Sequence, residues 1–179
     1  MNKSEIRKKL LKIREKNHYK KLKINFNHIN KRIKNKNILN KTIGGYYPCN
    51  YEINPINIFK NFEKKKYFLS LPKIKKNFQM DFYKWSSKEP LKVNKYGIPE
   101  PISNKIIYPT ILLVPLIAYD KNLNRIGYGG GYYDRYIQKM KKKKKIFIIG
   151  LAYSYQKIKK IPTNKYDMKL DYIITEKNN

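Results

Sequence analysis

Apolar residues recur at helical spacing in the first part of the chain. Between residues 4 and 16, Ile6 and Leu10 mark one face of a predicted helix, and the same spacing returns between residues 26 and 33. A polar, asparagine-containing stretch separates the two segments. We therefore expect two N-terminal helices within residues 1–40.

The middle of the chain alternates between strand-like and loop-like patterns. TIGGYYP (42–48) predicts a short strand that ends in a proline-blocked loop, and Pro55 is suited to the first position of a following helix. YFLSLP (67–72) predicts a buried strand stopped by its proline, and the alternation in 78–85 predicts a half-exposed strand. Residues 86–109 carry four prolines and little periodicity, so we expect a long surface loop.

The most apolar segments lie in the C-terminal part. Residues 110–120 and 145–153 are continuous apolar runs, which are typical of strands covered on both faces. A helix is predicted between them at 131–140, and a further strand at 171–175. Strands that alternate with helices predict a single α/β domain over residues 1–179, with a mainly parallel central sheet and helices on both faces.

The formal net charge of +30 first suggests a nucleic-acid partner. However, only five of the 42 basic residues are arginine, and lysine, asparagine, isoleucine and tyrosine, all abundant here, have AT-rich codons. The lysines are spread along the chain, and the run Lys141–Lys145 reads as a solvated helix end. We expect no specific nucleic-acid partner, and a basic RNA-binding protein remains the first alternative.

Membrane and secretory signals are absent from the sequence. No apolar run approaches the roughly 18 residues needed to span a bilayer, and the charged N-terminus lacks the apolar segment of a signal peptide. The single cysteine, Cys49, excludes an internal disulfide and fits a reducing compartment. We expect a cytoplasmic monomer with no membrane contact.

Half of the chain's eight glycines lie within NRIGYGGGYYDRY (124–136), between a predicted buried strand and a predicted helix. Backbone N–H groups in such a turn can converge on an anion, and the helix N-terminus adds partial positive charge. Arg125 and Arg135 flank the turn and are placed to contact phosphate oxygens. This pattern predicts a phosphate-binding loop; the alternative is a tight turn that needs glycine for its backbone angles alone. It is neither a Walker A motif nor a complete Rossmann fingerprint.

Asp134 lies just inside the helix that follows the glycines. It can complement the helix dipole, or it can bind a Mg²⁺ ion that bridges phosphate oxygens. A metal site of this kind would gain a second carboxylate from Asp167 or Asp171.

LVPLIAYDKNLNRIGYGGGYYDRY (113–136) closely resembles the signature of the 5-formyltetrahydrofolate cyclo-ligase family. GIPEP (97–101), IGLAYSYQ (149–156), YDMKLDYIITE (166–176) and the N-terminal KSEIRKKL agree with the same family. The resemblance implies an enzyme that uses ATP and Mg²⁺ to convert 5-formyltetrahydrofolate into 5,10-methenyltetrahydrofolate, releasing ADP and phosphate. Such chemistry needs positioning and charge neutralisation rather than a nucleophilic side chain.

The resemblance also implies site residues. Tyr47 and Glu52 match positions that contact the substrate, and Asp134 and Asp167 match Mg²⁺ ligands. The positions that match the glycine loop and face the folate are Tyr128, Gly129, Gly130, Gly131 and Tyr132. The positions that match the ATP site are Lys3, Ser4, Glu5, Ile6, Arg7, Arg125, Ile126, Gly127, Tyr128, Gly129, Gly130, Gly131, Tyr132 and Tyr133.

Several side chains have simpler interpretations. Without the resemblance, Glu52 would be a surface acid and Tyr47 a buried aromatic residue. Cys49 has no histidine nearby in sequence and reads as a bystander, and Trp85 reads as a packing residue. A second alternative to the enzyme is a nucleotide-binding relative that has lost folate chemistry.

Overall fold

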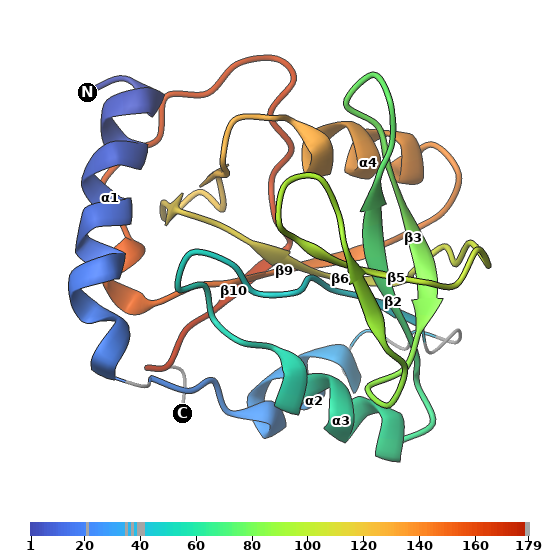
Figure 1. Ribbon diagram of the computed structural model, residues 1–179. Coiled ribbons are helices and arrows are strands. Elements are labelled where there is room, and N and C mark those ends of the chain that lie inside the picture. The colour runs from blue at the N-terminus through green and yellow to red at the C-terminus, as the bar shows by residue number, and fades with distance from the viewer. Residues whose placement is uncertain (21, 35, 37, 39–41, 178–179) are drawn as a thin grey trace.

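The computed structural model describes residues 1–20, 22–34, 36, 38 and 42–177 (Figure 1). Within them, six strands form a sheet in the order β10-β9-β6-β1-β2-β3, and all neighbours pair in parallel except β3, which is antiparallel to β2. The strands are β1 (Thr42–Gly44), β2 (Phe68–Ile74), β3 (Met80–Trp85), β6 (Ile111–Pro115), β9 (Phe147–Leu151) and β10 (Tyr172–Ile174). The predicted single α/β domain with a mainly parallel sheet is confirmed.

Helices cover both faces of this sheet, with α4 above it and α2 and α3 below it in Figure 1. Ile29 of α2 and Phe62 of α3 are buried in one core, and Ile137 and Met140 of α4 are buried in the other. The helices are α1 (Lys3–Asn17), α2 (Phe26–Lys34), α3 (Ile56–Lys64) and α4 (Tyr132–Lys141), with short 3₁₀ helices at His18–Lys20 and Ser154–Gln156. Pro55 comes immediately before α3 rather than at its first position. No helix in the described ranges combines the length and apolar character needed to cross a membrane.

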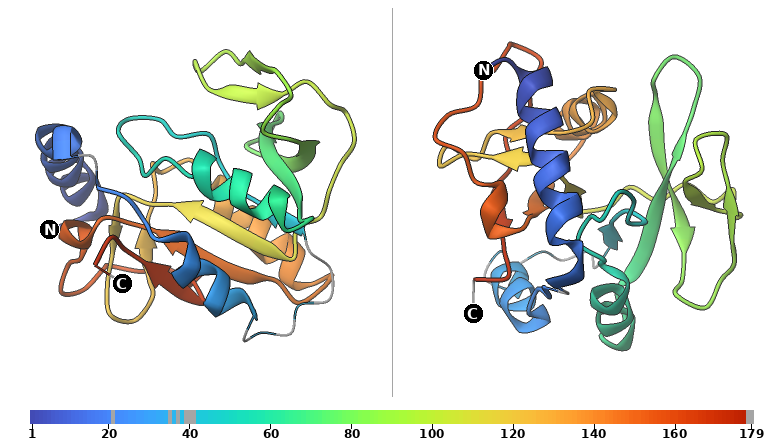
Figure 2. Two further views of the ribbon diagram at one scale, coloured as in Figure 1. Left: turned by 90° about the horizontal axis from the view of Figure 1, so that it is seen from below. Right: turned by 60° about the vertical axis from the view of Figure 1, so that its left-hand side comes forward.

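Helix α1 stands to one side of the sheet (Figures 1 and 2). It begins where expected because Asn2 accepts a bond from the backbone of Glu5, whose side chain bonds back to Asn2. Ile6 and Leu10 then pack in a third core, against the hairpin described below. Of the predicted N-terminal region, residues 21, 35, 37, 39 and 40 lie outside the described residues.

Strand β2 continues past Pro72, where the sequence predicted its end. The pairing of β2 with β1 ends at Ser70, and from there, among the described residues, β2 pairs as a strand only with β3. A missing N–H is tolerated where a strand is paired on one side only. The prediction that 78–85 is half-exposed is also wrong: β3 is buried at five of its six positions, because Phe82 packs on Tyr136 of α4 and residues 105–107 bond along its outer edge.

Residues 86–109 contain an antiparallel hairpin, β4 (Leu91–Val93) with β5 (Pro99–Pro101), where the sequence predicted only a loop. Glu100 stabilises it: its buried carboxylate accepts bonds from the backbone of Ile74 and the side chain of Asn94. Strand β5 begins and ends with proline, so the sequence shows no strand-like alternation of apolar and polar residues here.

The apolar run 110–120 is two elements rather than the one strand predicted. Strand β6 ends at Pro115, and the chain then turns into a separate hairpin of β7 (Ala118–Tyr119) and β8 (Arg125–Ile126). This β7–β8 hairpin leads directly into the glycines and α4, so it determines where the glycine-rich turn lies relative to the sheet.

Candidate active site

A cleft of about 1010 Å³ lies at the carboxyl ends of the parallel strands. Its walls come from the start of α1, the segment after β1, the β2–β3 turn, the β4–β5 hairpin, the glycine-rich turn with the start of α4, and residues 164–167. Ligands of open α/β sheets bind at this edge. The predicted association of the glycine-rich turn with such an edge therefore agrees with the structure.

The glycine loop, residues Gly127–Gly131, connects β8 to α4. Gly129 and Gly131 have φ of +103° and +66°, which residues with a Cβ rarely adopt. Gly131 is the N-cap of α4 and provides no side-chain cap. Among the described residues, the N–H groups of Gly129, Gly130 and Gly131 have no acceptor in the protein. The loop and the helix end therefore present unpaired donors and partial positive charge to the cleft.

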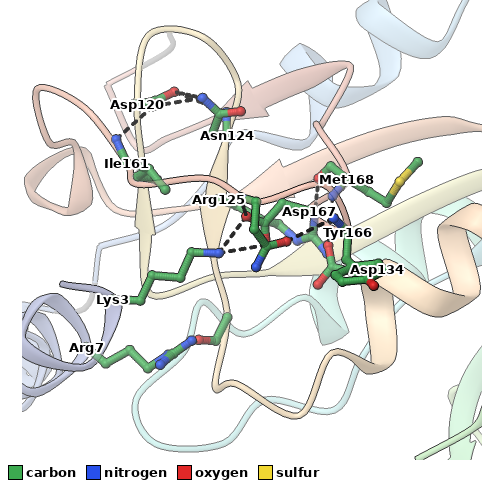
Figure 3. A network of polar contacts seen from close by, with 12 residues as sticks. Lys3, Arg7, Asp120, Asn124, Arg125, Asp134, Ile161, Tyr166, Asp167 and Met168 are labelled. Carbon is green, nitrogen blue, oxygen red and sulfur yellow. Dashed lines mark hydrogen bonds and ion pairs between the residues drawn. The ribbon is translucent and has the colours of Figure 1, made fainter.

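Two basic side chains of α1 extend toward the cleft, Arg7 to the glycine loop and Lys3 to Asp167 (Figure 3). Arg7 Nε donates to the carbonyl of Gly127 at 2.7 Å, and Lys3 Nζ contacts both oxygens of Asp167 at 2.5 and 2.7 Å. Lys3 and Arg7 are four residues apart and share a helix face, so both line the cleft. Ile6 instead packs in the core beneath α1, and Ser4 and Glu5 are exposed.

Two carboxylates of the cleft have basic partners: Asp134 pairs with Arg125, and Asp167 pairs with Lys3 (Figure 3). Asp134 Oδ1 accepts from Arg125 Nη2 at 2.9 Å and from the backbone of Met168 at 3.0 Å, while Asp167 pairs with Lys3. Asp134 and Asp167 are 28% and 24% exposed and both line the cleft. Asp171, the other residue considered, lies just before β10 and accepts from the backbone of Ile148 in β9 instead.

Arg135 lines the cleft, and its predicted contact with phosphate stays a prediction. It donates to the carbonyls of Phe78 and Gly130, which fastens the glycine loop to the β2–β3 turn. Its guanidinium lies over the rings of Phe78 and Tyr132, 5.7 Å from each centroid.

The opposite wall follows β1 and holds Glu52. Its Oε2 accepts from the backbone of Cys49 at 3.0 Å, and its Oε1 is buried with no partner among the described residues. Burial raises the pKa of Glu52, while bonds from Cys49 and the charge of Arg14 act in the opposite direction. Tyr47 lies in the same wall and is half-buried. An unpaired buried acceptor in a cleft is suited to a ligand N–H donor.

Comparison with known proteins decides the family. Residues 1–176 match the model of the 5-formyltetrahydrofolate cyclo-ligase family. The chain belongs to this family. A 5-formyltetrahydrofolate cyclo-ligase from Haemophilus influenzae is 41% identical over 95 residues, and in that match the chain spans only 50% of the relative's length. One from Mycoplasma genitalium is 31% identical over 135 residues, covering 75% of this chain and 72% of the relative.

Solved structures agree with the cyclo-ligase family. The NMR structure of Aquifex aeolicus 5,10-methenyltetrahydrofolate synthetase has a TM-score of 0.75 and 30% identity, and covers 99% of this chain and 91% of its own. A 5,10-methenyltetrahydrofolate synthetase from Mycoplasma pneumoniae has a TM-score of 0.71 and 25% identity, with 99% and 100% covered. The predicted family and fold are therefore confirmed.

Two side chains in this family member have the passive roles that the sequence suggested. Burial, followed by the nearby charge of Glu52, raises the pKa of Cys49 to about 12, so its thiol stays protonated and unreactive. Trp85 packs edge-on against Phe59 in the core, with ring centroids 6.0 Å apart.

Sequence reasoning missed several residues of the site. Arg14 is 1% exposed and contacts Tyr128 of the glycine loop. Tyr96, from the β4–β5 turn, lines the cleft beside Tyr132. The spacing of seven residues from Arg7 to Arg14, two helical turns, was the available signal for Arg14. Tyr96 had none beyond its place next to GIPEP.

Proposed function

We propose that this chain converts 5-formyltetrahydrofolate into 5,10-methenyltetrahydrofolate with ATP and Mg²⁺, releasing ADP and phosphate. The observation that carries the proposal is the content of one cleft: a loop of unpaired N–H donors on one side and the unpaired buried oxygen of Glu52 on the other. The first suits phosphate, and the second suits the N–H groups of a pterin ring.

The glycine loop is the proposed triphosphate site. The N–H groups of Gly129–Gly131 and the N-terminus of α4 donate to phosphate oxygens, and Lys3 and Arg7 add positive charge from α1. The backbone angles of Gly129 and Gly131 let the chain approach the ligand closely. These groups are fixed before ATP arrives, so little reorganisation opposes the reaction.

Asp134 and Asp167 are the proposed Mg²⁺ ligands. The described residues hold no cluster of three or more histidine, cysteine or acidic side chains that could form a closed metal site. Two carboxylates in a phosphate-binding cleft nevertheless fit Mg²⁺, which uses one or two protein carboxylates and keeps waters and phosphate oxygens as its other ligands. When bound, the ion neutralises charge on the transferring phosphoryl group.

Glu52 and Tyr47 are the proposed folate contacts. Glu52 accepts hydrogen bonds from the pterin through Oε1, and Tyr47 offers a flat apolar surface beside it. Tyr128 of the glycine loop and Tyr132 at the start of α4 line the same cleft and bring the folate next to the nucleotide.

The reaction needs these residues for positioning rather than for covalent catalysis. The formyl oxygen attacks the γ-phosphorus of ATP, and ADP leaves. N10 then attacks the formyl carbon, the oxygen departs as inorganic phosphate, and N10 loses its proton. The cleft holds the formyl group and the γ-phosphate in line and excludes water from the activated formyl carbon. We also propose that the protein acts as a monomer in the cytoplasm, where a reducing environment suits its single cysteine.

The test is the near-ultraviolet absorbance of the methenyl product when purified protein is mixed with 5-formyltetrahydrofolate, ATP and Mg²⁺. We expect absorbance to rise only when all components are present, and ADP to form in equal amount. A folded protein that binds ATP and forms no product would instead be a nucleotide-binding relative without folate chemistry.

A further inference from the structure

Arg14 is a charged side chain inside the protein that the proposed chemistry does not use. It lies on α1 and is 1% exposed. Its Nη2 donates to the carbonyl of Leu116 at 2.5 Å, immediately beyond the carboxyl end of β6. The guanidinium therefore lies behind the cleft, at the point where the central strands end.

The other end of this guanidinium contacts both walls of the cleft. Arg14 Nη1 lies 3.1 Å from the hydroxyl of Tyr128, which belongs to the glycine loop. The same nitrogen lies 3.4 Å from the carbonyl of Asn50, in the segment that carries Glu52. Asn50 and Tyr51 have φ of 47° and 59°, so this segment makes a turn that needs support from its surroundings.

Packing and hydrogen bonding alone do not account for a buried arginine here. The carbonyl of Leu116 also accepts from Gln156 Nε2 at 2.8 Å, so it is satisfied without Arg14. The Nε of Arg14 is buried with no partner among the described residues, which is costly. A buried charge that stabilises the fold poorly is more readily explained by the geometry that it imposes on its neighbours.

We propose that Arg14 is a positioning residue that holds Tyr128 and the turn before Glu52 together as a single folate-binding wall. The inference rests on the proposed function. Arg14 touches neither ligand; it fixes the distance between the loop side and the Glu52 side of the pterin site. Arg14 makes no hydrogen bond to the groups proposed to bind the triphosphate, which are the N–H groups of Gly129–Gly131, Lys3 and Arg7. We therefore expect folate binding to depend on Arg14 more than ATP binding does.

The experiment compares Arg14→Met and Arg14→Lys with Lys12→Met, which removes an exposed cation from the same helix. We expect Arg14→Met to raise the KM for 5-formyltetrahydrofolate roughly tenfold or more, the usual effect of losing a hydrogen bond to a charged group. The KM for ATP should stay within about twofold, since backbone donors are unchanged. Arg14→Lys should recover part of the loss, and Lys12→Met should behave as wild type.

A double-mutant cycle separates positioning from general stability. If Arg14 acts through Tyr128, then Arg14→Met combined with Tyr128→Phe should raise the folate KM less than the product of the two single effects. Equal losses of ATP and folate affinity, or an unchanged folate KM in folded Arg14→Met, would overturn the positioning role. If Arg14→Met does not fold, the Arg14→Lys and Tyr128→Phe proteins test the positioning role instead. An unchanged KM for folate in both of these proteins would overturn that role. Absence of product from the wild-type protein would overturn the proposed function itself.

Discussion

At the scale of single residues, Glu52 shows how burial and function oppose each other. Its carboxyl is 8% exposed, and one oxygen lacks a partner among the described residues. Burial raises its pKa, so the folded protein binds this proton more tightly than the unfolded chain does. Stability contributed by this group is therefore fully present below the ordinary glutamate pKa and is lost as the pH rises through the raised pKa.

Glu52→Gln is accordingly expected to be more stable than wild type at pH 8, because it removes the cost of a buried charge. The gain should disappear well below the ordinary glutamate pKa, for example at pH 3, where Glu52 is protonated in both states. The same substitution should weaken folate binding roughly tenfold or more, since a carboxylate acceptor is lost. Urea unfolding at the two pH values and folate titration measure these effects. A variant that is equally stable at pH 8 and binds folate normally would contradict this role.

The sequence indicated some residues of the candidate site and missed others. The glycine loop and Asp134 were visible because their chemistry is encoded within a few consecutive positions. Arg14 was not, because its contacts with Tyr128 and Leu116 join residues about a hundred positions apart. The carbonyl contacts of Arg135 with Phe78 and Gly130 were also missed, because its place beside the glycines suggested only a contact with phosphate.

At the scale of elements, the β7–β8 hairpin positions the glycine loop. Asp120 holds its turn: the buried carboxylate accepts from the backbones of Asn122, Asn124 and Ile161 and from the side chain of Asn124 (Figure 3). Burial alone would raise the pKa of Asp120, but these hydrogen bonds outweigh it and lower the pKa. Such a group stabilises the fold above its ordinary pKa, and the contribution is lost as the pH falls through the lowered value.

Asp120→Asn should therefore destabilise the protein by about 2 kcal/mol at pH 7, the scale of losing charge-assisted hydrogen bonds. The difference from wild type should narrow below pH 4, where the wild-type carboxyl begins to protonate. Denaturant unfolding across this range is the measurement, with Lys121→Ala, an exposed neighbour, as control. A difference that stays constant with pH would show that the charge of Asp120 contributes nothing.

Elements with local signals were predicted well, and those that depend on partners were not. The helices and the buried strands β6 and β9 followed from periodicity and continuous apolar runs. The β4–β5 hairpin and the extension of β2 through Pro72 could not be predicted in this way. A proline predicts the end of a strand unless it is known that the strand is paired on one side only. The end of β6 at Pro115 was hidden by an apolar run that continues into β7.

At the scale of the whole molecule, the cleft joins α1, the segment after β1, the β7–β8 hairpin and the start of α4. A nucleotide bound there contacts elements distant in sequence, so it should stabilise the entire fold. The positive charge, in contrast, is spread along the chain and favours weak, salt-sensitive contacts with any polyanion.

ATP with Mg²⁺ at a hundred times its Kd should raise the Tm by about 5–10 °C, which corresponds to about 2.7 kcal/mol in a domain of this size. Gly129→Ala should lose most of this shift, because a side chain at φ of +103° strains the backbone of the loop. Single-stranded RNA at 0.15 M salt should give a much smaller shift. Stabilisation by RNA but not by ATP would favour the RNA-binding alternative.

The proposed function depends above all on the unpaired main-chain donors of the glycine loop, which we propose to bind the triphosphate. The decisive measurement is a crystal structure of the protein soaked with a non-hydrolysable ATP analogue and Mg²⁺. We predict phosphate oxygens within hydrogen-bond distance of the N–H groups of Gly129–Gly131, with the metal ion beside Asp134 and Asp167. A nucleotide bound elsewhere, with no ligand at an unaltered glycine loop, would rule out this triphosphate site.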